Sequence, residues 1–248
     1  RFKEEKYYGK PLSGFGDVNA KLLIVGLAPA AHGGNRTGRM FTGDSSGDWL
    51  FKVMHKHGFA SIPTSQTSND GLILKNAYIT AAVRCAPPQN KPTREEMETC
   101  FNYLEQEKEI LTNVTTILCL GKIAYDATCK LYKVKPEKFG HDKLFSYDGF
   151  KILTSYHPSK QNTQTGRLVW TQWSAVFAKA KKLINKLSLK DVLKANDYSF
   201  LISIDGGTTN GVAIIQLDKR GCHGITLKSY TIGELTQFIF TNSFSRDT

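Results

Sequence analysis

Polar and aromatic side chains gather in one glycine-rich stretch near the start of the chain, residues 26–49. The stretch follows an apolar run at residues 21–25, as expected where a buried strand opens into a loop. It supplies an imidazole, an amide, two guanidinium groups, an aromatic ring and a carboxylate, from His32, Asn35, Arg36, Arg39, Phe41 and Asp44. Its repeated glycines let backbone N–H groups approach a ligand, because no Cβ stands in the way. We therefore interpret this stretch as an active-site loop.

Two further segments with chemically useful side chains also follow apolar runs. Residues 84–92, RCAPPQNKP, come after the run at residues 77–83, and residues 157–168, HPSKQNTQTGRL, come after the run at residues 151–156. In a sheet of parallel strands, ligands bind at the carboxyl ends of the strands. We therefore expect the three segments to converge on one crevice.

Strands and helices alternate along the first three quarters of the chain, which predicts a three-layer α/β/α fold with a central four-stranded parallel sheet. The expected strands lie at residues 21–25, 77–83, 114–120 and 151–156. The expected helices lie at residues 46–57, after a capping box at Thr93 and Glu96, at residues 122–131 and at residues 170–187. Residues 1–187 thus form one domain, residues 188–199 a polar linker, and residues 200–248 the start of a second, β-rich domain.

Composition narrows the class of partner. The net charge of +11 favours a polyanion, and so nucleic acid, although a merely basic protein has the same composition. No apolar run approaches a membrane span and no signal-peptide pattern is present, so we expect an intracellular, cytoplasmic, DNA-associated monomer without a membrane partner. Five cysteines, an odd number, argue against a disulfide framework and leave metal binding or burial. The arginine start and the polar end indicate a fragment.

Two long motifs, GLAPAAHGGNRTGRMFTGD and HPSKQNTQTGRL, resemble the signatures of the uracil-DNA glycosylase superfamily, and most closely those of its family 5, the type B enzymes. The resemblance covers about residues 7–186. It implies a DNA-repair enzyme that flips uracil, or another deaminated base such as hypoxanthine, out of DNA and hydrolyses its N-glycosidic bond. The rival interpretation is a non-catalytic damaged-DNA binder that keeps the pocket. A nucleotide-phosphate enzyme is disfavoured, because neither GxGxxG nor GxxxxGK[ST] is present.

The resemblance also implies roles for individual residues. His157 would donate a hydrogen bond to the negative charge that develops at O2 of the departing base, although a structural loop histidine is the alternative. Phe41 would stack on the flipped base. The implied base pocket consists of Gly26, Leu27, Ala28, Ala31, His32, Phe41 and Asn90, and the implied DNA contacts are Asn35, Arg36, Ser159, Asn162, Arg167 and Leu168. Arg167 and Leu168 stand at the place of the intercalating segment, but Leu168 and Phe41 are also typical core residues.

The chain departs from the commoner glycosylase families at two places. Residues 27–30, directly after Gly26, contain no Asp or Asn. Ala81 and Ala82 stand where other families have a base-reading Asn. Both absences are typical of type B enzymes. We expect Asp44 to position water or stabilise the sugar cation instead. Asp48 is a weaker rival, because its helix position points it away, and Asp44 could simply cap the helix that follows.

Family members carry a four-cysteine [4Fe–4S] cluster, and Cys85 and Cys100 stand at the places of two ligands. No cysteine occurs in residues 1–84, so we expect this chain to hold only part of the cluster site, with no catalytic metal for the glycosylase. The tail segment ISIDGGTTNGVAII resembles the first hairpin of ribonuclease H-like nucleases, including Holliday-junction resolvases, in which Asp205 would ligate Mg²⁺. It is also similar to the phosphate loop of actin-like sugar kinases.

Overall fold

The computed structural model describes residues 2, 4–185, 199–204, 212–218 and 221–228. The chain divides into two compact units, Arg1–Asn185 and Lys186–Thr248. No helix within the described ranges is long and apolar enough to cross a membrane.

The first unit is built on a six-stranded sheet with the strand order β1-β3-β2-β4-β6-β5. Its four central strands, β3 (Ala77–Ala81), β2 (Leu22–Gly26), β4 (Thr116–Leu120) and β6 (Phe150–Ser155), run parallel to one another. The predicted four-stranded parallel sheet is therefore confirmed. Two antiparallel edge strands that the sequence analysis does not predict, β1 (Phe15–Gly16) and β5 (Lys143–Tyr147), complete the sheet.

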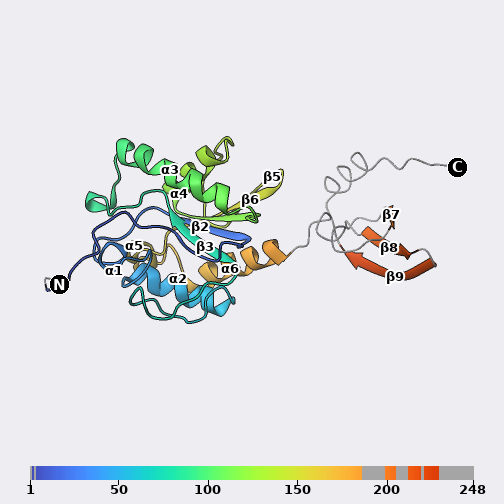
Figure 1. Ribbon diagram of the computed structural model, residues 1–248, viewed down its shortest axis with the longest axis horizontal. Coiled ribbons are helices and arrows are strands. Elements are labelled where there is room, and N and C mark those ends of the chain that lie inside the picture. Colours follow the sequence, from blue (N-terminus) through green and yellow to red (C-terminus); the bar gives the residue numbers. More distant parts are fainter. Residues whose placement is uncertain (1, 3, 186–198, 205–211, 219–220, 229–248) are drawn as a thin grey trace. The chain divides into compact units, whose positions relative to one another are not determined.

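The central strands are mostly apolar and mostly buried because helices cover both faces of the sheet. Successive residues of β2 point to opposite faces, so that Leu22 and Ile24 join one buried cluster while Leu23 and Val25 join another. Helices α2 (Ser45–Lys56) and α6 (Trp170–Asn185) cover the first face, and α4 (Lys122–Leu131) and α3 (Arg94–Ile110) lie on the second (Figure 1). These three layers are the predicted α/β/α fold.

Edge strand β5 shows which local signal the strand prediction overlooks. Tyr147 pairs with Phe150, so only Asp148 and Gly149 form the turn between β5 and β6. Gly149 has a φ of 80°, which glycine adopts at little cost, and Asp-Gly is a preferred pair in two-residue hairpin turns. The antiparallel partner of β6 was therefore encoded locally.

The second unit contains the strands β7 (Ser199–Ile204), β8 (Val212–Asp218) and β9 (Gly221–Lys228) in an antiparallel sheet in that order. The predicted metal ligand of the tail, Asp205, lies outside the described residues. A ribonuclease H-like domain at residues 200–248 therefore stays a prediction.

Candidate active site

Two of the three predicted segments meet at the carboxyl ends of the central strands. The aromatic rings of Phe41 and His157 stack with their centroids 5.9 Å apart and 26° between their planes. Phe41 also covers the last residue of β2, since a Cβ built on Gly26 would lie 2.9 Å from Cζ of the ring. A Cβ on Gly121, which follows β4, would lie 3.8 Å from Cβ of His157. The segments that follow β2 and β6 therefore lie together at this edge, beside the residue that follows β4.

Phe41 is held in an unusual backbone conformation. Its φ of 55° falls in the left-handed region, which a bulky residue adopts only where its surroundings hold it there. Its carbonyl group packs against Gly47, where an added Cβ would lie 1.8 Å from the oxygen. The side chain is 8% exposed and belongs to the core. Phe41 is thus part of the core and, at the same time, part of the wall beside His157.

His157 lies in the turn that follows β6. Burial lowers the pKa of its imidazole to about 4, so the ring is neutral at pH 7. Its carbonyl oxygen accepts a hydrogen bond of 2.8 Å from Nδ2 of Asn162. Ser159 caps the short helix α5 (Lys160–Gln164), with its Oγ accepting from the backbone N–H of Asn162. Two predicted DNA contacts, Ser159 and Asn162, therefore also hold the turn that carries His157.

Asp44 is the N-cap of α2. Its Oδ1 accepts hydrogen bonds of 2.9 Å from the backbone N–H groups of Ser46 and Gly47. Its Oδ2 faces Gly33, where an added Cβ would lie only 2.0 Å away. Burial raises the pKa of the carboxyl group despite these two hydrogen bonds, and the charge of Asp48 adds to the effect. Asp44 therefore caps α2, and both of these hydrogen bonds engage the same carboxylate oxygen, Oδ1.

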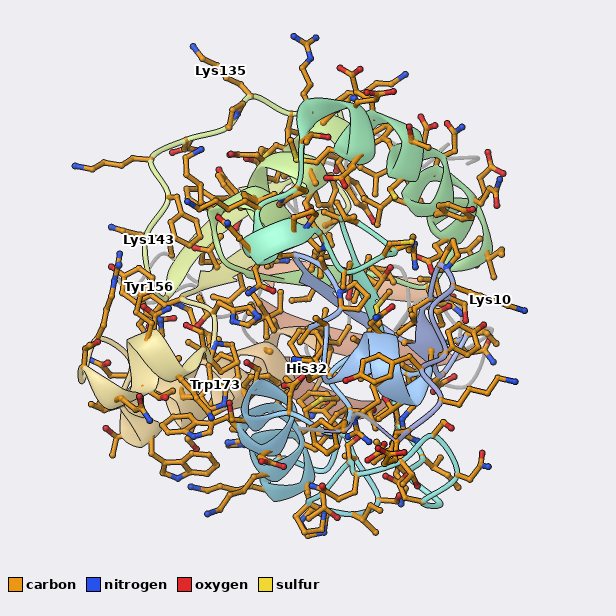
Figure 2. All side chains as sticks on the ribbon, turned by 90° about the vertical axis from the view of Figure 1, so that its left-hand side faces the viewer. Lys10, His32, Lys135, Lys143, Tyr156 and Trp173 are labelled. Atoms are coloured by element: carbon orange, nitrogen blue, oxygen red, sulfur yellow. The ribbon has the colours of Figure 1, made fainter. Side chains whose placement is uncertain are left out.

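The N-terminal segment holds the rest of the glycine-rich loop. The hydroxyl of Tyr7 lies 2.6 Å from Nδ1 of the exposed His32. Within α1 (Gly34–Thr37), Arg36 donates from Nε to the carbonyl of His32 and from Nη1 to Glu5. Asn35 donates from Nδ2 to the carbonyl of Ala31 at 3.4 Å. This local network therefore positions three predicted pocket or DNA-contacting residues, of which Figure 2 labels His32.

Two other charged residues of this region serve the neighbouring loop instead. Both Oδ atoms of Asp70 accept from Nη2 of Arg39, at 2.7 and 2.8 Å. Asp48 is exposed and accepts from Nε2 of Gln66 at 3.0 Å. Arg39 therefore acts as a structural residue of the loop, and Asp48 is hydrogen-bonded to the same neighbouring loop through Gln66.

The structure corrects the expectation for Leu168. This side chain is 0% exposed within the core, so it is not presented to DNA in this conformation. Its backbone N–H donates to the carbonyl of Asn162 at 2.9 Å, which turns the segment inward. The neighbouring residues Arg167 and Val169 are exposed instead. Sequence periodicity could not decide this, because the segment is too short to show which side faces the core.

Arg167 has an aromatic support that the sequence analysis missed. Its guanidinium carbon lies 4.4 Å from the ring centroid of Tyr156, and that ring stacks on His141 with 5.3 Å between centroids. The only signal in the sequence was the position of Tyr156 immediately before His157. The stack holds the Arg167 cation at the edge of the site.

The third predicted segment follows β3. Asn90 is exposed, has a φ of 56°, and no described residue is hydrogen-bonded to its side chain. Cys85 and Cys100 are neighbours, since the N–H of Arg84 reaches Sγ of Cys100 at 3.5 Å. Partial burial raises the pKa of the Cys85 thiol, and the Cys100 thiol raises it further. Within the described part of the chain, no three His, Cys, Asp or Glu side chains are grouped as a metal site.

A neutral histidine, a stacked aromatic ring and a half-buried carboxylate are thus carried by the loops at the carboxyl ends of the central strands of a parallel α/β/α sheet. Residues 13–186 match the family model of the uracil DNA glycosylase superfamily, and the chain belongs to this superfamily.

Curated relatives narrow the resemblance. The chain is 45% identical to the type-5 uracil-DNA glycosylase of Thermus thermophilus over 185 residues, which cover 73% of this chain and 84% of the relative. It is 42% identical to the type-5 uracil-DNA glycosylase of Pyrobaculum aerophilum over 180 residues, which cover 73% and 79% of the two chains. The chain is 32% identical to the type-4 uracil-DNA glycosylase of the same organism over 161 residues, which cover 62% of this chain and 74% of that enzyme. The predicted family is thus confirmed, and the similarity to the two type-5 enzymes exceeds that to the type-4 enzyme.

Proposed function

We propose that this chain is a monofunctional uracil-DNA glycosylase that removes uracil, or another deaminated base, from DNA and leaves an abasic site. The observation that carries the proposal is the neutral His157 ring stacked beside Phe41 at the edge of the sheet. The groups proposed to do the chemistry come from one chain, so we propose that the enzyme acts as a monomer.

His157 is the proposed donor to the departing base. When the bond between N1 and C1′ breaks, its electron pair stays with the base and negative charge develops on O2. A neutral imidazole carries one N–H, which it can donate to that oxygen. The low pKa of His157 keeps the ring neutral across the physiological range. The hydrogen bond from Asn162 to the carbonyl of His157 holds the backbone that carries the ring.

Asp44 is the proposed group for the sugar and the water. Water supplies hydroxide to C1′ and a proton to the departing base, so the hydrolysis is balanced without another reagent. Its Oδ2 can orient that water or face the positive charge on the sugar, while Oδ1 stays fixed by the two N–H groups of α2. The raised pKa brings this carboxyl group closer to the pH range in which it can accept a proton.

DNA contacts are proposed at the rim of this site. Arg167, held against Tyr156, is placed to contact a phosphate, and Asn35 and Arg36 lie on the glycine-rich loop. The net charge of +11 supplies the general attraction to DNA.

Cys85 and Cys100 are proposed as two ligands of a [4Fe–4S] cluster. Four thiolates hold such a cluster, and the described residues bring only these two together, so we derive no step through it. Cys119 and Cys129 are buried in the core cluster that contains α4 residues, and they do not supply the two missing cluster ligands. Iron and sulfide analysis of protein prepared without oxygen tests this proposal, and a colourless, iron-free preparation contradicts it.

A strand-cleavage assay tests the glycosylase activity. A duplex with a single uracil is incubated with the protein and then treated with alkali, which cuts abasic sites. We expect cleavage at the uracil and none in a matched duplex with thymine. Replacing His157 by Ala should slow cleavage about 100-fold or more, as expected when one donor to an oxyanion is removed.

The same experiment separates the enzyme from the damaged-DNA binder. Protein that binds the uracil duplex more tightly than the thymine duplex, but produces no alkali-sensitive site, supports the binder and rejects the proposal. Cleavage at the wild-type rate by the His157→Ala variant rejects the role of His157 while leaving the activity intact.

A further inference from the structure

The three tryptophans of the chain form one cluster at the start of α6. Nε1 of the buried Trp173 donates to the carbonyl of Trp49 at 3.1 Å. The rings of Trp49 and Trp170 meet edge to face, with 5.7 Å between centroids. Both rings are half-buried, so each has one part packed on the core and one part at the surface.

Two lysines of α2 lie over the exposed part of Trp170. Nζ of Lys52 is 5.3 Å and Nζ of Lys56 is 5.9 Å from the ring centroid. The lysines are one helical turn apart and exposed, and neither forms an ion pair with a carboxylate in the described part of the chain. The site therefore combines two exposed cations with an aromatic ring.

The two elements that carry this cluster also carry, or directly follow, residues of the proposed active site. Asp44 caps the same helix that carries Lys52 and Lys56, and Arg167 is three residues before Trp170. Val169, between them, is 40% exposed. In Figure 2, α2 lies between the labelled residues His32 and Trp173. We call Lys52, Lys56, Val169 and Trp170 the indole–lysine patch.

We infer that the indole–lysine patch binds an unpaired nucleotide of DNA next to the target base. Its position relative to the target rests on the proposed function, but the binding itself depends only on the patch. Aromatic rings next to cations bind single strands without sequence preference, because every base can stack and every phosphate carries charge.

One nucleotide can contact both the two lysines and the aromatic ring of the patch. Without DNA, the two ammonium groups lie over the electron-rich face of the indole. A phosphate attracts both amines away from the ring, and the base of the same nucleotide stacks where they lay, against Trp170 and Val169. A duplex keeps its bases paired and cannot stack one of them there, so the patch favours single-stranded DNA or DNA opened beside the flipped base.

Tryptophan fluorescence tests the patch directly, because all three tryptophans lie in this cluster. The probe is an oligothymidylate of about 12 nucleotides, within the range that one such surface covers. It contains no uracil, so binding can be measured even if the protein excises nothing. We expect the oligonucleotide to quench the fluorescence, and a duplex of equal length to quench it less.

The lysines are tested by the double variant Lys52→Gln/Lys56→Gln. Removing one phosphate contact to a single strand reduces the slope of log K against log salt by about 0.7, so we expect a reduction of about 1.4 for two contacts. The matched control is Lys108→Gln/Lys130→Gln, which removes two lysines that also lie over aromatic rings, but in the α3–α4 layer. The control should keep the wild-type slope. Equal slopes for both double variants, or for wild type and Lys52→Gln/Lys56→Gln, overturn the inference.

Trp170 is tested by Trp170→Ala, with Trp170→Phe as the variant that keeps an aromatic ring. We expect at least about fivefold weaker binding of the oligothymidylate by the Ala variant, and partial recovery by the Phe variant. Unchanged affinity in a folded Ala variant overturns stacking on Trp170. A protein that binds the oligothymidylate through the patch but never excises uracil rejects the proposed function alone.

Discussion

Phe41 and His157 come from different motifs, yet their rings stack at 5.9 Å above the last residue of β2. This pair links the glycine-rich loop to the turn after β6, so a change at either residue alters the geometry of the other. The same contact ties Asp44 to the pair, because the carbonyl of Phe41 packs on Gly47 in the first turn of the helix that Asp44 caps.

Gly26 should tolerate no side chain. A Cβ at this position would lie 2.9 Å from Cζ of Phe41, and the Phe41 backbone is itself held against Gly47. We expect Gly26→Ala to displace the ring from His157, lower uracil excision by about tenfold or more, and lower the free energy of unfolding by about 1–3 kcal/mol. Excision assays and urea denaturation measure the two effects.

Gly149→Ala is the control for this substitution. Gly149 has a φ of 80° and open space around it, so the change adds backbone strain of about 1–2 kcal/mol without touching the site. It should therefore destabilise the protein and leave excision unchanged. An equal fall in excision in both variants would mean that stability, and not the Phe41 ring, governs the rate.

Asp44 has two roles that substitution can separate. Asn is as good an N-cap as Asp, so Asp44→Asn should retain most of the stability of α2 and lose the charge, with a large fall in excision. Asp44→Ala should lose about 1 kcal/mol in addition. The matched control is Thr93→Ala, which removes the N-cap of α3 on the other face of the sheet from α2 and should cost similar stability without loss of excision. Full activity of Asp44→Asn would leave Asp44 as a cap only.

His157 should make the protein less stable in acid. The pKa of its imidazole is about 4 in the folded protein and about 6.5 when unfolded. Between these values the unfolded chain binds a proton that the folded chain does not, so this contribution to stability is lost as the pH falls from about 6.5 towards 4. His157→Asn should show a smaller loss of stability over this range than wild type.

The same pKa gives an expectation for activity. The rate of excision should not fall between pH 7 and pH 5 through protonation of His157, because the ring stays neutral there. Proton titration of His157 followed by NMR measures this directly. A midpoint near pH 6.5 in the folded protein would contradict the buried environment.

Arg84 and Glu107 should contribute strongly to stability. Arg84 is 1% exposed and forms two hydrogen bonds with the Glu107 carboxylate, at 3.0 and 2.6 Å. Glu107→Gln leaves the buried guanidinium without its counter-charge, and we expect a loss of about 3–5 kcal/mol in urea denaturation. Glu98→Gln breaks the exposed pair with Arg94 and should change nothing measurable. A small effect at Glu107 would show that water replaces the carboxylate at Arg84.

The four parallel strands and the helices that follow them were predictable because burial is visible in the local pattern of apolar residues. A strand covered on both faces can be apolar throughout, as in Leu22–Gly26, and some helix starts carry their own side-chain cap, as at Asp44 and Thr93. The two long motifs were enough to predict the family, which the comparisons confirm. The residues proposed for catalysis were found through the same motifs, and their roles stay predictions.

Which side chains contact one another was decided by the tertiary structure. Leu168 and Arg167 are adjacent, yet one is in the core and the other lies against Tyr156. Arg39 of the glycine-rich loop is bound to Asp70, and His32 to Tyr7. The sequence by itself determined the four central strands, the longer helices and which segments carry polar groups, because periodicity and capping act between near neighbours. Which of those groups remain free for a ligand depends on contacts between distant parts of the chain, and only the folded structure contains them.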